Sequence, residues 1–345
     1  MKILVGISGG VDSAFAAQKL KDDGHDVEGA ILKMHEYTEL FAAQEVAESI
    51  GIPLHILDCT DSFDKIIRKN FVDEYLCGRT PNPCIICNER VKFKELYDYA
   101  MKNGFDAIAT GHYAKIRRIE DGEFVRYAFC APADLSKDQT YMLYRLPEEI
   151  VSRLVLPLGD YCKTEVRSEA AEAGISVADR PDSQEICFLP LGNYSEYIES
   201  VAGKCPEGNF VDPEGRVLGK HKGIIHYTVG QRKGLGISLG ERAFVTKIDP
   251  IDNTVTLSSK VAGVHFVKVR DAVFSGMSVP EKGHKGSFFA KLRYSARAIP
   301  CIADFGNDGE ITLEFEDAVK AAPGQSAVLY RDGAVMFGGF IFDSF

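Results

Sequence analysis

The sequence lacks any apolar run long enough to span a bilayer, and its first residues resemble a strand rather than a signal peptide. These absences argue against a membrane-spanning protein and predict a cytoplasmic one. In a reducing compartment, the nine cysteines are expected to be reduced, metal-bound or catalytic, and not to form structural disulfides.

The sequence also lacks an excess of basic residues. Its 40 Lys and Arg face 50 Asp and Glu, which gives a net charge of −10. This charge argues against non-specific binding of nucleic acid, although a local basic face on an acidic body stays open. The 345 residues exceed what one hydrophobic core usually organises, so we expect two or three domains.

The stretch from Gly6 to Ser13 reads Gly-Ile-Ser-Gly-Gly-Val-Asp-Ser. An apolar run at 3–5 predicts a buried strand before it, and residues 14–20 predict a helix after it. The two central glycines let successive backbone N–H groups converge on an anion beside the positive end of that helix. The sequence therefore predicts a phosphate-binding loop.

This loop lacks the Gly-Lys-Ser/Thr of a Walker A motif and the three-glycine spacing of a dinucleotide fingerprint. Its pattern, Ser-Gly-Gly-x-Asp-Ser, resembles the PP-loop of ATP pyrophosphatases, which release pyrophosphate while they transfer AMP to a substrate oxygen. The resemblance implies bound ATP with Mg²⁺. The implied ATP-binding residues are Gly6, Ile7, Ser8, Gly9, Gly10, Val11, Asp12 and Ser13.

Strand and helix patterns alternate through the first half of the chain. Strands are expected at 27–32, 54–58 and 107–110, and helices at 39–50, 62–76, 91–101 and 163–173. This alternation predicts an α/β domain with a doubly wound parallel sheet, in which ligands bind beyond the carboxyl ends of the strands. We therefore assign Leu32 and Gly111 to the nucleotide pocket; the alternative is a core leucine and an ordinary glycine at a strand end.

A proline-rich stretch carries two of the cysteines. Pro81 and Pro83 predict a stiff loop that presents Asn82, Cys84 and Cys87 before a helix, whose dipole would favour a thiolate. Cys-x-x-Cys alone is a weak signal. We expect the other cysteines outside the resemblance described next to be small hydrophobic residues or surface thiols, namely Cys59, Cys77, Cys130, Cys162, Cys205 and Cys301.

Seven motifs in a fixed order make the chain similar to the tRNA-specific 2-thiouridylases. They are Ser-Gly-Gly-Val-Asp-Ser at 8–13, Gly-Arg-Thr-Pro-Asn-Pro at 78–83 with Cys87-Asn88, Ala-Thr-Gly-His-Tyr at 109–113, Lys-Asp-Gln-Thr-Tyr at 137–141, Asp-Ser-Gln-Glu-Ile-Cys-Phe at 182–188, 226–236, and Pro-Gly-Gln-Ser-Ala at 323–327. The resemblance covers effectively the full length.

In that family, as the resemblance implies, ATP adenylates the C2 oxygen of a wobble uridine in tRNA, and sulfur then displaces AMP. By position, Cys187 matches the cysteine that carries a persulfide, and Cys87 matches its catalytic partner. The partners implied are tRNA and a sulfur donor, either a cysteine desulfurase or a sulfur-relay protein. The implied tRNA-binding residues are Asn82, Pro83, Cys84, His112, Lys137, Asp138, Gln139, Arg293, Tyr294 and Gln325.

The chain departs from the family at one position, because many members have Asp where it has Cys84. If the two cysteine motifs meet, Cys84, Cys87 and Cys187 are expected to lie together. Three thiolates can hold a [4Fe–4S] cluster with one iron open to sulfide. Cluster-free persulfide chemistry, with Cys84 as a bystander or spare resolving thiol, is the alternative.

The expected domains are a PP-loop catalytic domain over 1–190, a small β-rich domain over 191–265 and a C-terminal β-barrel over 266–345. A hairpin is expected at 115–130 within the first domain. Two other functions stay open. One is a PP-loop enzyme that adenylates a small molecule for amination, and the other is a non-catalytic RNA-binding module.

Overall fold

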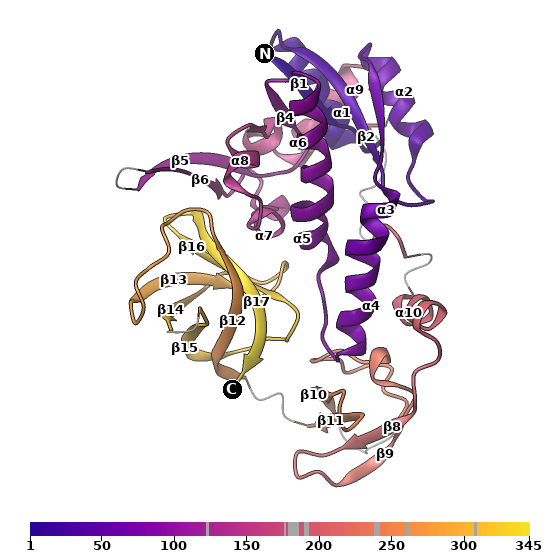
Figure 1. Cartoon of the computed structure of the whole chain (residues 1–345), viewed down its shortest axis with the longest axis vertical. Coiled ribbons are helices and arrows are strands. Elements are labelled where there is room, and N and C mark those ends of the chain that lie inside the picture. Colours follow the sequence, from indigo (N-terminus) through magenta and orange to yellow (C-terminus); the bar gives the residue numbers. More distant parts are fainter. Residues whose placement is uncertain are drawn as a thin grey trace.

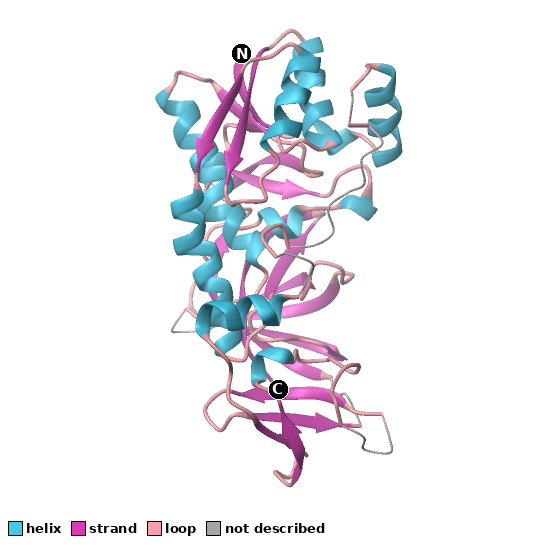
Figure 2. Cartoon of the chain, turned by 90° about the vertical axis from the view of Figure 1, so that its right-hand side faces the viewer, coloured by secondary structure: helices cyan, strands magenta, loops and turns pink. Residues whose placement is uncertain are grey.

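The computed structural model describes residues 1–121, 124–175, 177–178, 186–189, 193–237, 242–259, 263–306 and 309–345. The chain is elongated, with an α/β domain at one end and two β-rich parts at the other (Figures 1 and 2). No helix among these residues has the length and apolar character needed to cross a membrane.

The first sheet is fully parallel. Its strands are β1 (Lys2–Gly6), β2 (Asp26–Lys33), β3 (Leu54–Asp58), β4 (Ala107–Ala109) and β7 (Leu154–Val155), in the order β3-β2-β1-β4-β7. The predicted doubly wound sheet is confirmed. The chain moves from β1 toward one edge and later returns to place β4 on the other side of β1. The ends of β1 and β4 therefore form the topological switch point where such folds bind ligands.

Both faces of this sheet are buried, as the apolar run at its start requires. Ile3 and Val5 pack on one face with α1 (Val11–Asp22), α2 (Leu40–Ile50) and α9 (Lys163–Glu172). Leu4 points to the opposite face and belongs to a second core that includes residues of the helices between 60 and 102.

Two long helical columns run from this domain toward the β-rich parts (Figure 1). One comprises α3 (Thr60–Phe63), a π-turn (Asp64–Arg68) and α4 (Lys69–Leu76). The other comprises α5 (Pro83–Cys87), a π-turn (Asn88–Lys92) and α6 (Phe93–Lys102). Shorter elements are two 3₁₀ turns (Leu135–Lys137 and Pro157–Asp160), α7 (Thr140–Leu143), α8 (Glu148–Val151) and α10 (Tyr194–Ala202).

The start of the second column corrects one expectation. Asn82 caps the helix by accepting a hydrogen bond from the N–H of Cys84 at 3.2 Å, and Pro83 occupies the first helical position. Cys84 and Cys87 therefore lie on the helix itself and not on the loop before it. Proline fits here because the first helical residue needs no N–H donor.

The β-rich half forms two sheets. The central part has β8 (Gly208–Val211), β9 (Val217–His221), β10 (Phe244–Asp249) and β11 (Thr254–Ser258) around a 3₁₀ turn (Ile224–His226). The C-terminal part has β12 (Val264–Phe274), β13 (Lys285–Lys291), β14 (Ile299–Phe305), β15 (Ile311–Val319), β16 (Ser326–Arg331) and β17 (Ala334–Ser344). Pairing of β12 with both β15 and β17 closes the predicted barrel.

The expected hairpin consists of β5 (Lys115–Asp121) and β6 (Phe124–Cys130). It does not belong to the parallel sheet of the first domain. Cys130 of β6 pairs with Ala334 of β17, so the hairpin extends the sheet of the C-terminal barrel. The first domain and the barrel are thus joined by backbone pairing between β6 and β17.

Candidate active site

The predicted phosphate loop joins β1 to α1 at the switch point. Gly9 has φ +77°, and an added Cβ would lie 2.9 Å from the Cβ of Ala42, so the fold needs glycine at this position. Gly10 has an ordinary extended conformation and precedes the first helical residue, Val11. The helix starts three residues earlier than predicted, which places Asp12 in its first turn.

Two serines close the loop on itself. The hydroxyl of Ser13 accepts a hydrogen bond from the N–H of Ser8 at 3.1 Å and donates one to the carbonyl of Gly10 at 3.0 Å. Ser13 is buried, whereas Ser8 is exposed and keeps its hydroxyl near that of Ser13 at 3.2 Å. Hydrogen bonds within the loop therefore hold its shape, and Ser8 stays accessible.

The carboxylate of Asp12 is held by two partners from distant segments. Lys163, at the first position of α9, places its Nζ 2.7 and 2.8 Å from the two carboxylate oxygens. Tyr113 donates its hydroxyl to Oδ1 at 2.8 Å. This network fixes the acidic group that follows the loop and brings a buried cation to the expected phosphate site.

Gly111 and Leu32 lie in different environments. A Cβ on Gly111 would lie 2.6 Å from the backbone carbon of Asp12 and 2.7 Å from the nitrogen of Ser13. The end of β4 thus packs directly against the loop, which an ordinary strand-end glycine would not require. Leu32 is 8% exposed and belongs to the hydrophobic core.

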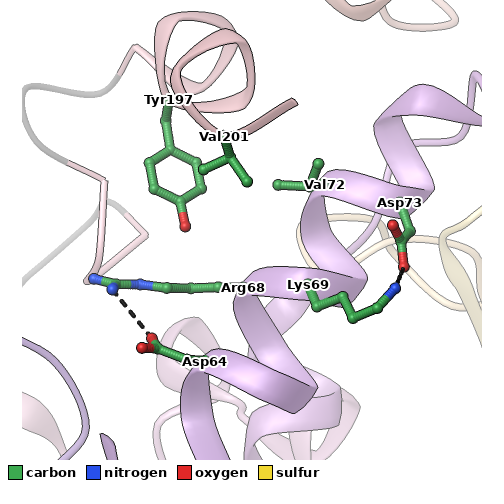
Figure 3. Close-up of a pocket in the computed structure, with 7 residues that line it drawn as sticks. All are labelled: Asp64, Arg68, Lys69, Val72, Asp73, Tyr197 and Val201. Carbon is green, nitrogen blue, oxygen red and sulfur yellow. Dashed lines mark hydrogen bonds and ion pairs between the residues drawn. The ribbon is translucent and has the colours of Figure 1, made fainter. Parts of the chain in front are cut away.

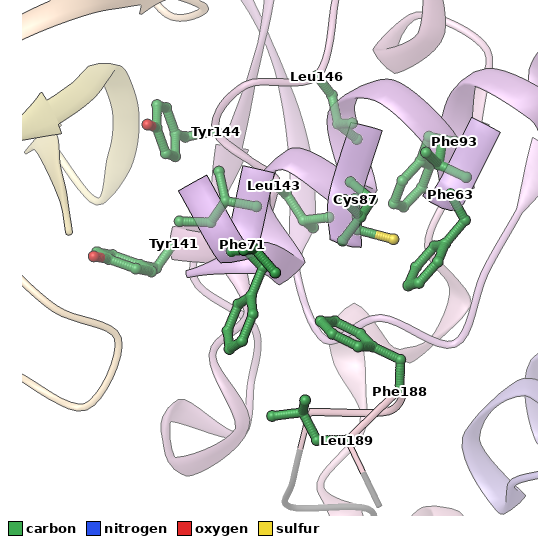
Figure 4. Close-up of a cluster of buried hydrophobic side chains, with 14 of the residues drawn as sticks. Phe63, Phe71, Cys87, Phe93, Tyr141, Leu143, Tyr144, Leu146, Phe188 and Leu189 are labelled. Atoms are coloured by element: carbon green, nitrogen blue, oxygen red, sulfur yellow. The ribbon is translucent and has the colours of Figure 1, made fainter. Parts of the chain in front are cut away.

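The candidate thiols differ in exposure. Cys87 is buried among aromatic residues that include Phe63 and Phe188 (Figure 4), and its Sγ lies 3.9 Å from the Sδ of Met34. Cys84 and Cys187 are exposed. Of the motif that contains Cys187, residues 182–185 lie outside the described part of the chain.

The three thiols interact electrostatically, so the structure brings both cysteine motifs together as expected. Burial raises the pKa of Cys87 to about 12, and Cys84 and Cys187 add to the rise while Lys92 opposes it. Surrounding protein also raises the pKa of Cys84 and of Cys187. The sequence predicted that the helix dipole would favour the thiolate, and at Cys87 that expectation is wrong because desolvation outweighs it.

Lys92 links the thiols to the nucleotide side of the site. Its positive charge acts on all three cysteines and on His112, whose pKa burial lowers to about 3 with Lys92 as the second cause. His112 directly follows Gly111. Its Nδ1 shares a hydrogen bond of 2.9 Å with Thr110 Oγ1, and its ring centroid lies 5.3 Å from that of Phe93. His112 is therefore neutral near pH 7.

A surface groove lies between α10 and the helical column that contains α4. It is lined by Asp64, Arg68, Lys69, Val72, Asp73, Tyr197 and Val201 (Figure 3). Arg68 pairs with Asp64 and Glu36, and its guanidinium lies 5.9 Å from the ring of Phe188. Its charge opposes the burial that raises the pKa of Cys187. Arg68 thus connects the groove to the candidate persulfide cysteine.

Several candidate tRNA-binding residues converge where the barrel meets the second helical column. Gln325 donates its amide to the carbonyl of Thr80 at 2.7 Å. Tyr294 is 40% exposed, and its pKa is raised by burial and by Asp138, with Lys137 lowering it and Cys84 raising it. Arg293 is exposed beside it. The residues of this junction therefore lie near Cys84.

Two residues of the same set also hold the local structure. Asp138 accepts hydrogen bonds from the N–H and hydroxyl of Thr140 at 2.9 and 2.6 Å and pairs with Lys291 at 2.6 Å. Gln139 accepts from the N–H of Tyr113 at 2.8 Å. Their side chains already fasten this segment to the barrel and to the strand-end loop.

Sequence reasoning missed Lys163 and Lys92. Lys163 lies 151 residues from its partner Asp12, and nothing in the local pattern of α9 points to that contact. Lys92 is positioned by the π-turn Asn88–Lys92, and hydrophobic periodicity does not predict such a turn. Tyr113 stands in a stretch already singled out by resemblance, so that stretch offered a signal.

Metal binding gets no direct geometric support. Within the described ranges, no three His, Cys, Asp or Glu side chains are placed to hold a metal ion. This finding covers Cys84, Cys87 and Cys187.

Comparison with known proteins accounts for the whole chain. Three family models match it: the tRNA methyl transferase HUP domain over 1–191, the tRNA methyl transferase PRC-barrel domain over 195–259, and the aminomethyltransferase beta-barrel domain over 264–341. A solved 4-thiouridine synthetase–RNA complex with bound ATP is 22% identical with a TM-score of 0.38, covering 54% of this chain and 44% of that chain.

Curated relatives are similar over their full lengths. The tRNA-specific 2-thiouridylase MnmA of Lachnoclostridium phytofermentans is 42% identical over 99% of both chains. The corresponding protein of Clostridium perfringens is 41% identical over 99% of this chain and 98% of its own. Identity at this level across all three domains means that the chain belongs to the tRNA-specific 2-thiouridylase family.

Proposed function

We propose that this protein is an ATP-dependent tRNA sulfurtransferase that converts the wobble uridine of tRNA to 2-thiouridine. The observation that carries this proposal is the full-length similarity to tRNA-specific 2-thiouridylases. A PP-loop enzyme that aminates a small molecule would not need the two β-rich domains or the cysteine pair. Because the substrate is tRNA, we place the reaction in the cytoplasm.

The first step activates the uridine. Its C2 oxygen attacks the α-phosphorus of ATP, and the bond to pyrophosphate breaks. Gly6 to Ser13 bind the phosphates with Mg²⁺, and Lys163 and Asp12 orient the loop at that point. Adenylation is needed because a urea-like carbonyl oxygen is a poor leaving group, whereas AMP departs readily.

The second step transfers sulfur. The terminal sulfur of a persulfide on Cys187 attacks C2, and AMP leaves with the original oxygen. The thiolate of Cys87 then attacks the Cys187 sulfur, which forms a Cys87–Cys187 disulfide and leaves the outer sulfur on uridine. A cellular thiol reductant restores both cysteines, and a cysteine desulfurase or relay protein reloads Cys187.

Domain roles follow from this scheme. The PP-loop domain over 1–190 performs the chemistry, and the parts over 191–265 and 266–345 hold the tRNA. Asn82, Pro83, His112, Lys137, Asp138, Gln139, Arg293, Tyr294 and Gln325 are the proposed contacts, with Cys84 beside them. Phosphate contacts by separated basic residues would make the affinity depend on salt.

The alternative sulfur carrier is a [4Fe–4S] cluster on Cys84, Cys87 and Cys187. The mutual electrostatic influence of the three thiols supports this alternative. Iron and acid-labile sulfide in anaerobically purified wild type and Cys84→Ala decide the matter. About four irons per chain, lost with Cys84, would establish the cluster.

The test of the main proposal uses unmodified tRNA, ATP and a persulfide donor. We expect pyrophosphate release that requires tRNA, together with 2-thiouridine detected by mass spectrometry after nuclease digestion. Pyrophosphate release without tRNA, or no 2-thiouridine under these conditions, would contradict the proposal.

A further inference from the structure

A buried arginine joins the candidate cysteine helix to the barrel. Arg145 is 7% exposed and grips the carboxylate of Glu89 with two hydrogen bonds, from Nε at 2.8 Å and from Nη2 at 3.1 Å. Its third nitrogen, Nη1, donates to the carbonyl of Asp271 at 2.8 Å, and its guanidinium lies 4.8 Å from the ring of Phe340. One side chain thus contacts β12 and β17 as well as the helix.

Glu89 occupies a special place in that helix. It lies in the π-turn Asn88–Lys92, which starts directly after Cys87. Isolated π-turns are rare and often occur at functional sites. The neighbouring Asn88 donates its amide to the carbonyl of Met142 at 3.0 Å, so two successive side chains tie the turn after Cys87 to the segment that carries Arg145.

That segment is itself seated on the barrel. Tyr141 donates its hydroxyl to the carbonyl of Ser326 at 2.9 Å, and the hydroxyl of Tyr144 lies 2.9 Å from that of Ser326. Both tyrosines are fully buried. Gln325, a proposed tRNA contact, immediately precedes Ser326. The path from the proposed tRNA contacts to the turn after Cys87 is therefore made of buried, hydrogen-bonded groups.

We propose that Arg145 is a positioning residue for the sulfur-transfer step. It fixes the position of the Cys87 helix relative to the barrel. The activated uridine of a tRNA bound to the barrel then lies within reach of the thiols. The inference rests on the proposed function. Adenylation depends on the PP-loop and on tRNA placement, whereas sulfur transfer depends in addition on the position of Cys87.

This difference gives a readout that a general loss of stability would not produce, namely the amount of 2-thiouridine formed per pyrophosphate released. Arg145→Met alone leaves the mostly buried carboxylate of Glu89 with only a looser ion pair to Arg90, at 3.7 Å. The principal variant is therefore Arg145→Met with Glu89→Met, which removes both charges. The matched control is Arg126→Met. Arg126 of β6 also bonds toward the barrel, to Ser278 at 3.0 Å, but it belongs to the hairpin and not to the segment that carries Arg145.

We expect the double variant to keep tRNA-dependent pyrophosphate release while its yield of 2-thiouridine per pyrophosphate falls about 100-fold, as a displacement near 1 Å can cause. Arg145→Lys keeps the positive charge but loses the planar guanidinium that bonds both carboxylate oxygens. Its yield of 2-thiouridine per pyrophosphate should lie between those of wild type and the double variant. Arg126→Met should keep the wild-type ratio.

An unchanged ratio in a folded double variant would overturn the inference, as would an equal fall in Arg126→Met. Circular dichroism shows whether the double variant folds. If it does not fold, the test uses Arg145→Lys instead, and a wild-type ratio of 2-thiouridine to pyrophosphate in Arg145→Lys would overturn the inference. Failure of the proposed function shows itself differently, because wild type would then form no 2-thiouridine at all.

Discussion

The ammonium group of Lys163 spans both carboxylate oxygens of Asp12, at 2.7 and 2.8 Å, across 151 residues of sequence. Lys163 is nearly buried, with 9% of its side chain exposed, and Asp12 retains 32%. The pair joins α9 to the first turn of α1. It therefore ties the shape of the phosphate loop to a helix that follows the whole parallel sheet in the chain.

Lys163→Met should slow tRNA-dependent pyrophosphate release about 10- to 100-fold, because the loop loses its buried cation and, of its two described partners, Asp12 keeps only Tyr113. Asp12→Ala should also block adenylation. The measurement is initial pyrophosphate release at saturating tRNA. Lys19→Met is the control, since it removes an exposed pair with Asp23 on the same helix. A wild-type rate in Lys163→Met would show that the pair is only structural.

Cys187→Ala should separate the two chemical steps. We expect adenylation to continue, seen as tRNA-dependent pyrophosphate release, because this thiol is not part of the loop. Formation of 2-thiouridine should be abolished, since no persulfide can form on alanine. Cys301→Ala, which changes a buried barrel thiol, serves as the control. Loss of adenylation in Cys187→Ala with tRNA binding retained would contradict the proposed order of steps.

Gly111→Ala should weaken ATP use because its Cβ would collide with the backbone of Asp12 and Ser13 at 2.6 to 2.7 Å. We expect the KM for ATP to rise about tenfold or more as the loop is displaced. Gly104→Ala tests strain alone, since Gly104 has φ +72° and open space around it. It should cost about 1 kcal/mol of stability without changing the KM.

Lys92→Met should make Cys87 less reactive. Burial raises the pKa of Cys87 to about 12 and Lys92 opposes that rise, so removing the charge moves the pKa further upward. Below this pKa the thiolate fraction grows with pH and is smaller in the variant at every pH. We expect alkylation of Cys87 by iodoacetamide to slow about tenfold at pH 8.

The measurement is mass spectrometry of the Cys87 peptide across a range of pH. Lys94→Met provides the comparison, since Lys94 is two residues away but pairs with Asp98. Equal alkylation rates in Lys92→Met and wild type would rule out Lys92 as the charge that acts on this thiol.

Much of the first domain could be predicted because its signals are local. The apolar run at 3–5 predicts a strand buried on both faces. Gly9, which has a left-handed φ, marks the tight loop after it. Each signal lies within a few residues of sequence. The barrel could also be predicted from its short alternating strands. The phosphate loop and its place at the carboxyl ends of the strands could be predicted from the residues. The proximity of Cys84, Cys87 and Cys187 was expected only if the two cysteine motifs meet.

The predictions that were wrong, and the contacts that were missed, depend on the tertiary environment of the residues. The helix dipole was expected to favour the thiolate of Cys87, yet burial among residues that include Phe63 and Phe188 raises its pKa. The hairpin pairs with β17 because its edge meets a strand about 200 residues later, which local pattern cannot show. The contacts of Lys163 and Arg145 are long-range for the same reason.

The hydrogen bonds of Tyr141 and Tyr144 to Ser326 have a consequence for synthesis on the ribosome. Ser326 is made 185 residues after Tyr141 and 182 after Tyr144. A nascent chain can form its parallel sheet and nucleotide loop early, since domains fold as units from the N-terminal side. The segment that supports the Cys87 helix cannot form its contacts with Ser326 until β16 has been synthesised. During translation the chain can therefore acquire its nucleotide loop well before the helix of Cys87 gains its support from the barrel.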